Sequence, residues 1–322
     1  MKEPSYIPPF TVTAKAINLV AEISALIERY AIRLEKSDGL LLRKVNRIKT
    51  IHSSLAIEGN KLSEDQVRDI IDGKNVIAPL REIQEVKNAM KTYELYPKLN
   101  PFNEKDLLKA HGVMMNSLTD DAGRFRHGGV GVFAGEKCVH LAPPATRVPF
   151  LIGDLFDWLK HSKDHLLIRS CVFHYEFEFI HPFSDGNGRM GRMWQTLLLM
   201  QWKPIFAWLP VETIVKENQQ KYYDAIALSD KQGNSTAFIT FMLKCILASL
   251  KEMCESNQKS NQKSNQKVLS AISENPDITI KELQTLIGLS ESGIKKILRQ
   301  LRNDSVIVRI GGAKGGHWEI LK

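Results

Sequence analysis

Cysteine is scarce in this 322-residue chain, and its few residues are scattered. The four are Cys138, Cys171, Cys245 and Cys254. No two of them stand at the Cys-x-x-Cys spacing that is typical of a metal or redox site. This spacing excludes a disulfide framework and a cysteine metal site, and it predicts reduced thiols in a cytoplasmic protein.

Long apolar runs are also absent. The longest, residues 197–209, is interrupted by Gln201, Lys203 and Pro204, and it is too short to cross a bilayer. The first residues contain no apolar signal segment. We therefore expect no membrane partner.

The charge balance is basic, with 44 Lys and Arg against 36 Asp and Glu, a net charge of +8 and a pI near 9.2. A balance of this kind leaves nucleic acid open as a partner without requiring it. The hydrophobic share of 43% is enough for a sizeable core, and the length predicts about two domains.

Apolar residues recur at three- and four-residue intervals through most of the chain, which predicts a mainly α fold. The expected helices are residues 13–44, 41–57, 66–72, 81–96, 101–117, 148–161, 168–180, 193–200, 211–228 and 235–253. Ser63 and Gln66 form a capping-box pattern before the third of them. Between Gly123 and Pro143 the pattern changes to short β-prone pieces at 130–133 and 138–141, which predict one hairpin.

Residues 256–267 repeat Ser-Asn-Gln-Lys three times without an apolar residue, which predicts a flexible linker. After it come helical patterns at 268–272, from Thr279, and at 290–303, followed by a hairpin at 306–320. Three helices and a hairpin in this order are typical of a winged helix-turn-helix. The predicted organisation is an N-terminal helical region (1–99), a core (100–255), the linker (256–267) and the winged module (268–322).

One glycine-rich segment gathers the densest set of chemically useful residues, His181-Pro182-Phe183-Ser184-Asp185-Gly186-Asn187-Gly188-Arg189-Met190-Gly191-Arg192. Its glycines let backbone N–H groups approach an anion, and it opens onto a helix N-terminus, which favours phosphate. The two arginines suit further phosphates, the aspartate suits Mg²⁺, and the histidine can take a proton near neutral pH. The segment predicts a Mg²⁺-nucleotide transfer site; the alternative is a helix-helix turn with capping charges.

This segment resembles the signature of the Fic family, His-Pro-Phe-x-Asp/Glu-Gly-Asn-Gly/Lys-Arg-x-x-Arg, at every specified position. Helices interrupted by one hairpin over about residues 100–245 also resemble the family core. The resemblance implies a Fic-type helical bundle that transfers AMP from ATP to a Ser, Thr or Tyr hydroxyl of a protein, with pyrophosphate released. The protein itself could be the acceptor.

The resemblance also implies a role for each residue of the segment. His181 would deprotonate the acceptor, Asp185 would hold Mg²⁺, and Phe183 would fix the turn in the core. Relatives that transfer phosphate instead of AMP carry Lys at the position of Gly188. The glycine in this chain therefore favours AMP transfer. The ATP-binding residues would be the backbone amides of Gly186, Asn187 and Gly188 together with Arg189 and Arg192.

Upstream, Ser54-Leu55-Ala56-Ile57-Glu58-Gly59 resembles the family's inhibitory pattern, Ser/Thr-x-x-x-Glu-Gly/Asn. The resemblance implies that Glu58 pairs with Arg192 and occupies the place of the γ-phosphate. The simpler interpretation is a solvated residue at a helix end.

The hairpin resembles the family's flap, which would bind the target through Gly131, Val132, Phe133 and Ala134 by adding a strand. An ordinary surface hairpin is the alternative. Tyr222 and Tyr223 stand where relatives contact adenine, although core packing explains them equally well. Asp230 departs from the asparagine that is common in relatives, so its role stays open.

In the C-terminal module, Lys295, Lys296, Arg299 and Arg302 against Glu291 make residues 290–303 a plausible recognition helix for DNA. Eight basic and six acidic residues over 268–322 give a weak field, which favours protein docking or target presentation over DNA binding. A homodimer is also open. One alternative for the whole chain is a transcription regulator whose Fic-like domain senses nucleotide. Others are a de-AMPylase or another nucleotidyl- or phosphotransferase.

Overall fold

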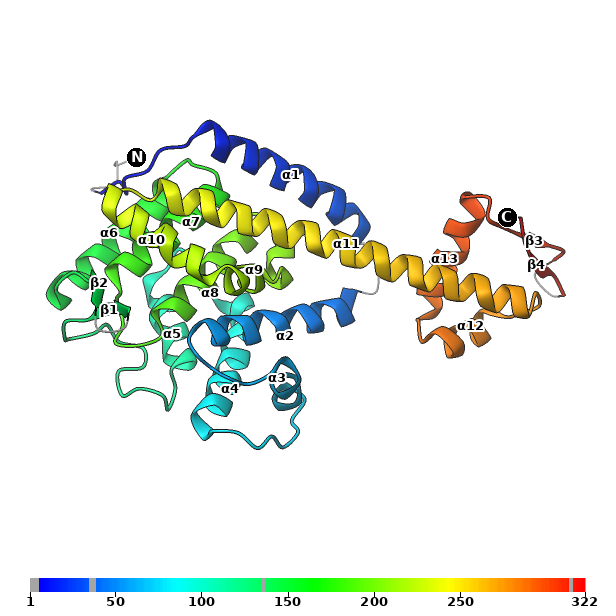
Figure 1. Cartoon of the computed structure of the whole chain (residues 1–322), viewed down its shortest axis with the longest axis horizontal. Helices are drawn as coiled ribbons and strands as arrows, with labels where there is room; N and C mark the ends of the chain where they lie inside the picture. Colours follow the sequence, from blue (N-terminus) through cyan, green and yellow to red (C-terminus); the bar gives the residue numbers. More distant parts are fainter. Residues whose placement is uncertain (1–5, 35–38, 135–136, 313–314, 322) are drawn as a thin grey trace. The chain divides into compact units, whose positions relative to one another are not determined.

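The computed structural model describes residues 6–34, 39–134, 137–312 and 315–321 (Figure 1). Its contacts divide the chain into two compact units. Unit 1 comprises residues 1–27 and 43–250, and unit 2 comprises residues 28–42 and 251–322. The two units are described separately.

The chain is mainly α-helical, as predicted. The helices up to the hairpin are α1 (Ala14–Leu34), α2 (Gly39–Ile57), α3 (Glu64–Ile71), α4 (Leu80–Glu94) and α5 (Glu104–Met114). After it come α6 (Val148–His161), α7 (Leu166–Ile180), α8 (Asn187–Met200), α9 (Val211–Glu217) and α10 (Gln219–Gln232). Short 3-10 turns lie at Tyr96–Lys98, Ala145–Arg147 and Pro204–Trp208.

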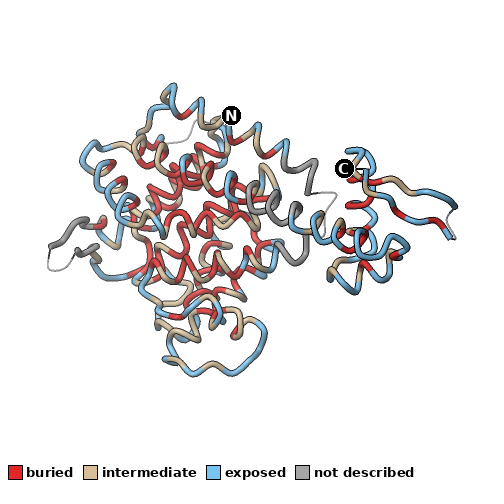
Figure 2. The backbone as a smooth tube through the Cα atoms, turned by 45° about the vertical axis from the view of Figure 1, so that its right-hand side comes forward, coloured by how far each residue is buried: buried red, intermediate tan, exposed pale blue. Residues whose placement is uncertain are grey.

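The centre of unit 1 is the packed pair α7 and α8. Most residues of both helices are buried, and Figure 2 shows the buried segments gathered in the interior of the unit. Helix α7 is apolar nearly all round, which is the pattern of a helix with neighbours on every side. The glycine-rich segment joins these two helices, so a buried and closely packed helix holds it at each end.

Local signals explain where several helices begin and end. Ser63 accepts from the backbone of Gln66, whose side chain accepts from the backbone of Ser63, so the predicted capping box before α3 is confirmed. The single helix predicted at 211–228 is instead two helices. Asn218 ends α9 outside helical geometry (φ −115°, ψ 32°), and its side chain donates to the carbonyl of Ile214. An asparagine that bonds its own backbone competes with the helix.

The predicted hairpin is present as β1 (Gly131–Ala134) and β2 (Lys137–Leu141), which pair antiparallel with a register shift between Val132 and Phe133. Its predicted turn residues 135 and 136 lie outside the described residues.

The prediction of a flexible linker at residues 256–267 is wrong. The backbone there is helical, because α11 runs from Thr236 to Glu274 without a break. Ser, Asn, Gln and Lys each cost only some tenths of a kcal/mol in a helix, and propagation from a formed turn is cheap. An apolar helical stretch precedes the repeat and another follows it, so the polar repeat continues the helix between them.

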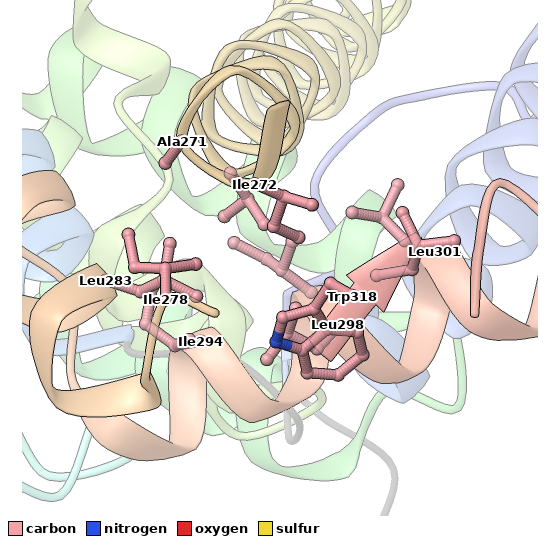
Figure 3. Packing of buried hydrophobic residues seen from close by; sticks show 11 residues of the cluster. Ala271, Ile272, Ile278, Leu283, Ile294, Leu298, Leu301 and Trp318 are labelled. Atoms are coloured by element: carbon pink, nitrogen blue, oxygen red, sulfur yellow. The ribbon is translucent and has the colours of Figure 1, made fainter. Parts of the chain in front are cut away.

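The end of α11 together with α12 (Ile280–Ile287), α13 (Glu291–Asn303) and the hairpin β3 (Ile307–Ile310)–β4 (His317–Ile320) forms the winged helix-turn-helix predicted from the sequence. Figure 3 shows its separate core, in which Ile272, Leu283, Leu298 and Trp318 meet from four elements. Lys314, in the turn of the hairpin predicted at 306–320, lies outside the described residues. In the described part of the chain, no helix is both long and apolar enough to span a membrane.

Candidate active site

His181 follows the last residue of α7 in the left-handed conformation, with φ 50° and ψ 62°. This region is uncommon for residues other than glycine, and here it turns the chain out of the helix. The ring nitrogen Nδ1 lies 3.3 Å from the carbonyl oxygen of Glu178. A proton on Nδ1 donates to that oxygen, which leaves Nε2 of the neutral ring as the acceptor that a general base needs.

Arg126 holds this strained position, although no pattern in the sequence singled it out. Its side chain is buried, and its Nε donates to the carbonyl of His181 at 2.7 Å. Its terminal nitrogens donate to the carbonyls of Gly128 (2.8 Å), Pro143 (2.5 Å) and Ile180 (3.3 Å). One guanidinium thus ties the candidate base to both chain ends of the hairpin segment. Burial lowers the pKa of Arg126.

The loop between His181 and α8 is closed by its own side chains. Both polar groups of the Asn187 amide bond the backbone of Phe183, at 2.9 Å and 2.8 Å. Phe183 is fully buried, as predicted, and its ring stacks on His111 with the centroids 3.6 Å apart. The asparagine and the phenylalanine therefore fix the turn.

His111, which the sequence analysis did not single out, supports the loop from α5. Its Nδ1 accepts from the backbone N–H of Gly123 at 2.9 Å, so its Nε2 carries the proton and donates to the carbonyl of Asp185 at 3.0 Å. Burial lowers the pKa of His111 to about 4, against the raising effect of its bond to Asp185, and the nearby Arg189 lowers it further. The ring is therefore neutral and acts as a fixed strut.

Asp185 lies before the N-terminus of α8 with its side chain 41% exposed. Its Oδ1 accepts from the backbone of Gly186 (2.6 Å) and from Arg189 (3.0 Å), and its Oδ2 accepts from Arg81 of α4 (3.2 Å). Gly186 has φ 84°, a conformation that glycine adopts without strain. The first N–H groups of α8 have no acceptor within the helix, so they face the loop as an anion site.

The two arginines are nearly inaccessible, with side chains 4% exposed at Arg189 and 3% at Arg192. Arg189 contacts Asp185, and its NH1 lies 3.6 Å from Oε1 of Glu85 on α4. A buried guanidinium needs a compensating anion, and both arginines have one. The anion of Arg192 comes from a distant segment.

Glu58 provides the anion that compensates Arg192, and the predicted contact between the two residues is present. Arg192 NH2 donates to Glu58 Oε1 at 2.8 Å and to the carbonyl of Ser54 at 3.0 Å, while its Nε donates to Ser54 Oγ at 3.2 Å. Burial alone would lower the pKa of Arg192, but Glu58, together with Tyr222 and Glu178, more than offsets this, and the pKa is raised. Both predicted residues of the upstream pattern therefore meet the second arginine.

Gly188 lies directly against this contact. A Cβ atom at position 188 would overlap Oε1 of Glu58 and approach Arg192 NH1 to 3.0 Å. Any other residue at this position would therefore have to displace the Glu58 carboxylate.

The tyrosines predicted near adenine differ from each other. Tyr222 is 2% exposed, and its hydroxyl lies 3.1 Å from Nε2 of His174. Its role toward adenine stays a prediction. Tyr223 is 43% exposed and accepts from Gln219. Asp230 accepts a bond from Tyr175 at 2.7 Å. An apolar or aromatic residue on a helix does not by itself tell core from ligand surface.

The flap residues Gly131, Val132, Phe133 and Ala134 form β1, which the structure describes at the level of backbone and register. Ala142, the residue after β2, donates from its backbone to the carbonyl of Val130 at 3.2 Å. With Arg126 bonding Gly128 and Pro143, the hairpin is fastened at its base beside His181.

A basic groove lies on the winged module, between α12, α13 and β3. Five cationic side chains line it with one carboxylate, that of Glu291, which pairs with Lys295 at 2.6 Å. The cations are Lys281, Lys295, Arg299, Arg302 and Arg309. Arg309 also stacks 4.8 Å from the ring centroid of Trp318, which fixes its direction.

Two family models match the chain. The Fic/DOC family matches residues 101–199, and the winged helix-turn-helix DNA-binding family matches residues 262–308. The first covers the hairpin, His181 and both arginines, and the second covers α12 and α13.

Among curated proteins, the protein adenylyltransferase Fic of Culex quinquefasciatus is 32% identical over 210 residues, which are 62% of this chain and 40% of that protein. The chain therefore spans about two fifths of the length of the curated relatives it matches. Fic-1 of C. elegans has a similar fold, with a TM-score of 0.63 at 22% identity over 77% of this chain and 74% of that one.

A crystal structure of a Fic family protein from Desulfovibrio desulfuricans G20 is similar along almost the whole chain. It is 43% identical and covers 98% of both chains, with a TM-score of 0.77. This match includes the Fic core and the winged module together. The chain belongs to the Fic family.

Proposed function

We propose that this protein is an autoinhibited protein adenylyltransferase. It transfers AMP from ATP to a Ser, Thr or Tyr hydroxyl of a protein, its own chain included. The observation that carries the proposal is the convergence of a base, a helix N-terminus and two buried arginines at the start of α8. Relatives named protein adenylyltransferase match across this region, which supports the same assignment.

In the proposed reaction, Nε2 of His181 takes the proton of the acceptor hydroxyl as the hydroxyl oxygen attacks the α-phosphorus of ATP. The new oxygen–phosphorus bond replaces the bond to the bridging oxygen, and pyrophosphate leaves with that electron pair. The N–H groups at the start of α8 and the Arg189 guanidinium stabilise the negative charge on the phosphates. At Gly188 the missing side chain leaves room for a phosphate once the Glu58 carboxylate is released.

The residues present fit a Mg²⁺ ion. Asp185 offers a hard, partly exposed carboxylate beside the phosphate site. Asp185 would hold the ion as a hard oxygen ligand. When bound, the ion would neutralise charge on the transferred phosphates. Arg81 contacts Asp185 and would have to release one carboxylate oxygen.

Control is proposed to come from Glu58. Its carboxylate occupies Arg192 at 2.8 Å, and an arginine that is paired in this way is not free for the γ-phosphate. While Glu58 is bound to Arg192, ATP would lack the contact between Arg192 and its γ-phosphate and would bind in a non-productive position. Release of Glu58 would then turn the enzyme on.

The test uses ATP labelled at the α-phosphate, Mg²⁺ and the full chain. Because the wild type is expected to be inhibited, His181→Ala is compared in the Glu58→Gly background. Glu58→Gly should label itself or an added protein, and Glu58→Gly/His181→Ala should not. The matched control is His161→Ala in the same Glu58→Gly background, at an exposed histidine of α6. It should label at the rate of Glu58→Gly. Equal labelling with and without His181 would refute a catalytic role, and label from γ-labelled ATP would indicate phosphate transfer.

We also propose that the winged module binds DNA through its phosphate backbone. Five cations on one groove against a single, already paired carboxylate support this partner over a protein surface. The match to a winged helix-turn-helix DNA-binding family supports it as well. The module would bring the enzyme to DNA or present a DNA-bound target to it.

Fluorescence anisotropy with a labelled mixed-sequence duplex tests this proposal. Arg299→Ala/Arg302→Ala should weaken binding and reduce the dependence of log Kd on log salt by about one per lost phosphate contact. Lys98→Ala/Lys105→Ala, in unit 1, is the charge-matched control. An equal loss of DNA affinity in both variants would mean that binding depends on net charge and not on the groove. Unchanged affinity in both variants would favour protein docking.

A further inference from the structure

The segment that carries Glu58 is a turn, and its position needs support from outside. Helix α2 ends at Ile57, so Glu58 lies beyond the helix, and Gly59 follows with φ 93°. The Glu58 side chain is 31% exposed, whereas its partner Arg192 is 3% exposed. A partly exposed side chain on a turn has several rotamers, so the single one that reaches the arginine must be selected.

Asn60 fastens this turn to α4. Its Nδ2 donates to Glu85 Oε2 at 2.8 Å and lies 3.3 Å from the carbonyl of Glu82, to which it also donates. Its Oδ1 accepts from the backbone of Leu62 at 3.1 Å, so both ends of the amide are used. The next residue, Lys61, donates from its backbone to Glu82 Oε2 at 3.1 Å.

Helix α4 is a firm anchor for these bonds. Val86 and Asn88 are fully buried, and the Asn88 side chain donates to the carbonyls of Met114 and Asn116 at the end of α5. Glu85 itself is 13% exposed. The turn is therefore fixed to a part of the core that does not depend on Glu58.

The same Glu85 also reaches the phosphate arginine. While its Oε2 accepts from Asn60, its Oε1 lies 3.6 Å from Arg189 NH1 and 3.6 Å from Arg81 Nε. The short contact is the one with Asn60. One carboxylate thus contacts the inhibitory turn with one oxygen and the catalytic arginine with the other.

We propose that Asn60 is a positioning residue for Glu58: its bond to Glu85 holds the turn at 58–60 against α4 and so keeps the Glu58 carboxylate on Arg192. The proposal rests on the proposed autoinhibition by Glu58. Gln219, whose side chain donates to the carbonyl of Ile57 at 3.0 Å, holds the other side of the turn. Loss of the Asn60 bond therefore loosens the turn without freeing it.

Asn60→Ala in the full chain tests the proposal by initial rates of AMP incorporation at subsaturating ATP. A lost hydrogen bond to a charged group corresponds to about tenfold or more, and the Gln219 anchor remains, so we expect an increase of about three- to tenfold. Glu58→Gly should exceed it. Asn234→Ala is the matched control, because its side chain bonds neighbouring residues of its own turn, and it should keep the wild-type rate.

The double variant Asn60→Ala/Glu58→Gly separates positioning from catalysis. If Asn60 acts through Glu58, the double variant labels at the rate of Glu58→Gly, within about twofold. A rate well below Glu58→Gly would mean that Asn60 sets Glu85 and Arg189 for catalysis, and it would overturn the proposal.

Two further outcomes distinguish the role of Asn60 from the autoinhibition by Glu58. A wild-type rate for Asn60→Ala beside an activated Glu58→Gly would refute the role of Asn60 and leave the autoinhibition intact. No activation in Glu58→Gly would refute the autoinhibition itself and this proposal with it. Thermal unfolding of each variant checks the fold, and a merely destabilised protein would lose activity where the proposal expects a gain.

Discussion

Replacing Glu58 with glycine removes the carboxylate from Arg192 and leaves its other contacts in place. Arg192 still donates to Ser54 Oγ at 3.2 Å and to the Ser54 carbonyl at 3.0 Å, so the side chain stays directed into the site. The perturbation therefore frees the NH2 hydrogen that was bonded to Glu58, while the bonds to Ser54 keep the guanidinium in place. We expect the rate of AMP transfer to rise.

The size of the rise follows from the contact that is lost. A hydrogen bond to a charged group contributes about 1.5–3 kcal/mol. The guanidinium is 3% exposed but the glutamate is 31% exposed, so solvent screens one end, and the lower half of that range applies. About 1.5–2.25 kcal/mol corresponds to roughly ten- to forty-five-fold in the competition between Glu58 and the nucleotide. Glycine at position 58 also loosens the turn by about 0.5–1 kcal/mol, which acts in the same direction.

The assay follows α-labelled ATP into protein over a range of ATP concentrations, for the wild type, Glu58→Gln and Glu58→Gly. Glutamine keeps the shape and can still accept from Arg192, but its amide carries no charge to attract the guanidinium, so the contact is weaker than that of the carboxylate. Glu58→Gln should therefore fall between the other two. Because the carboxylate and the γ-phosphate compete for one arginine, part of the gain should appear as a lower KM for ATP.

Two results would refute this reasoning. Equal rates for the wild type and Glu58→Gly would mean that the contact with Arg192 does not limit the reaction. A Glu58→Gln rate equal to that of the wild type, beside a fast Glu58→Gly, would mean that the side chain acts by its bulk and not by its charge.

Two further predictions follow from the same neighbourhood. Gly188→Ala should displace the Glu58 carboxylate, because its Cβ overlaps Oε1 of Glu58, but it also puts a methyl group where the phosphates approach the backbone. Labelling by Gly188→Ala should therefore stay below that of Glu58→Gly, and the substitution should lower the rate in the Glu58→Gly background; an unchanged rate in that background would contradict this. Because His111 has a pKa of about 4 in the fold, below its ordinary 6.5, the unfolded chain takes the proton first as the pH falls. The stability that neutral His111 contributes is therefore present above about pH 6.5 and declines by about 2 kcal/mol between pH 7 and pH 4.5. Denaturant unfolding at the two pH values should show a smaller decline for His111→Gln, and an equal decline would exclude His111 as the source.

The sequence predicted the parts of the site that form a local pattern. His181, Asp185 and the two arginines lie within twelve residues, so the turn that joins α7 to α8 brings them together, while Arg126 and His111 from other segments hold that turn. The contact between Glu58 and Arg192 joins residues 134 positions apart, and it was predicted because both ends belong to recognisable patterns.

The supporting residues could not be predicted in this way. Arg126, His111 and Glu85 are single residues without a spacing pattern, and their importance follows from burial and from the carbonyls and side chains they meet. Tyr222 shows the reverse problem. An aromatic residue on a helix is compatible with core and with ligand surface, and the packing of the chain decides between them.

The linker error has a similar physical origin. Composition indicates correctly that residues 256–267 cannot build a core of their own, but it does not show whether the backbone is ordered. Helix extension needs neither burial nor apolar side chains once a turn has formed, and α11 supplies that turn. Low complexity was therefore a poor guide to backbone conformation in a segment between two helical stretches.

The charges of the site suggest why its control is sensitive to small structural changes. Arg192 is paired with Glu58, and Arg189 with Asp185 and Glu85, so the cations that would bind phosphate are already neutralised by carboxylates. Binding of ATP is then an exchange of one anion for another, and its free energy is the difference between two large terms. In such an exchange a few kcal/mol in the position of one carboxylate changes occupancy by orders of magnitude. A turn fixed by the Asn60 bond is sufficient to set that difference, so a partner that shifts the turn would switch the enzyme without touching the catalytic residues.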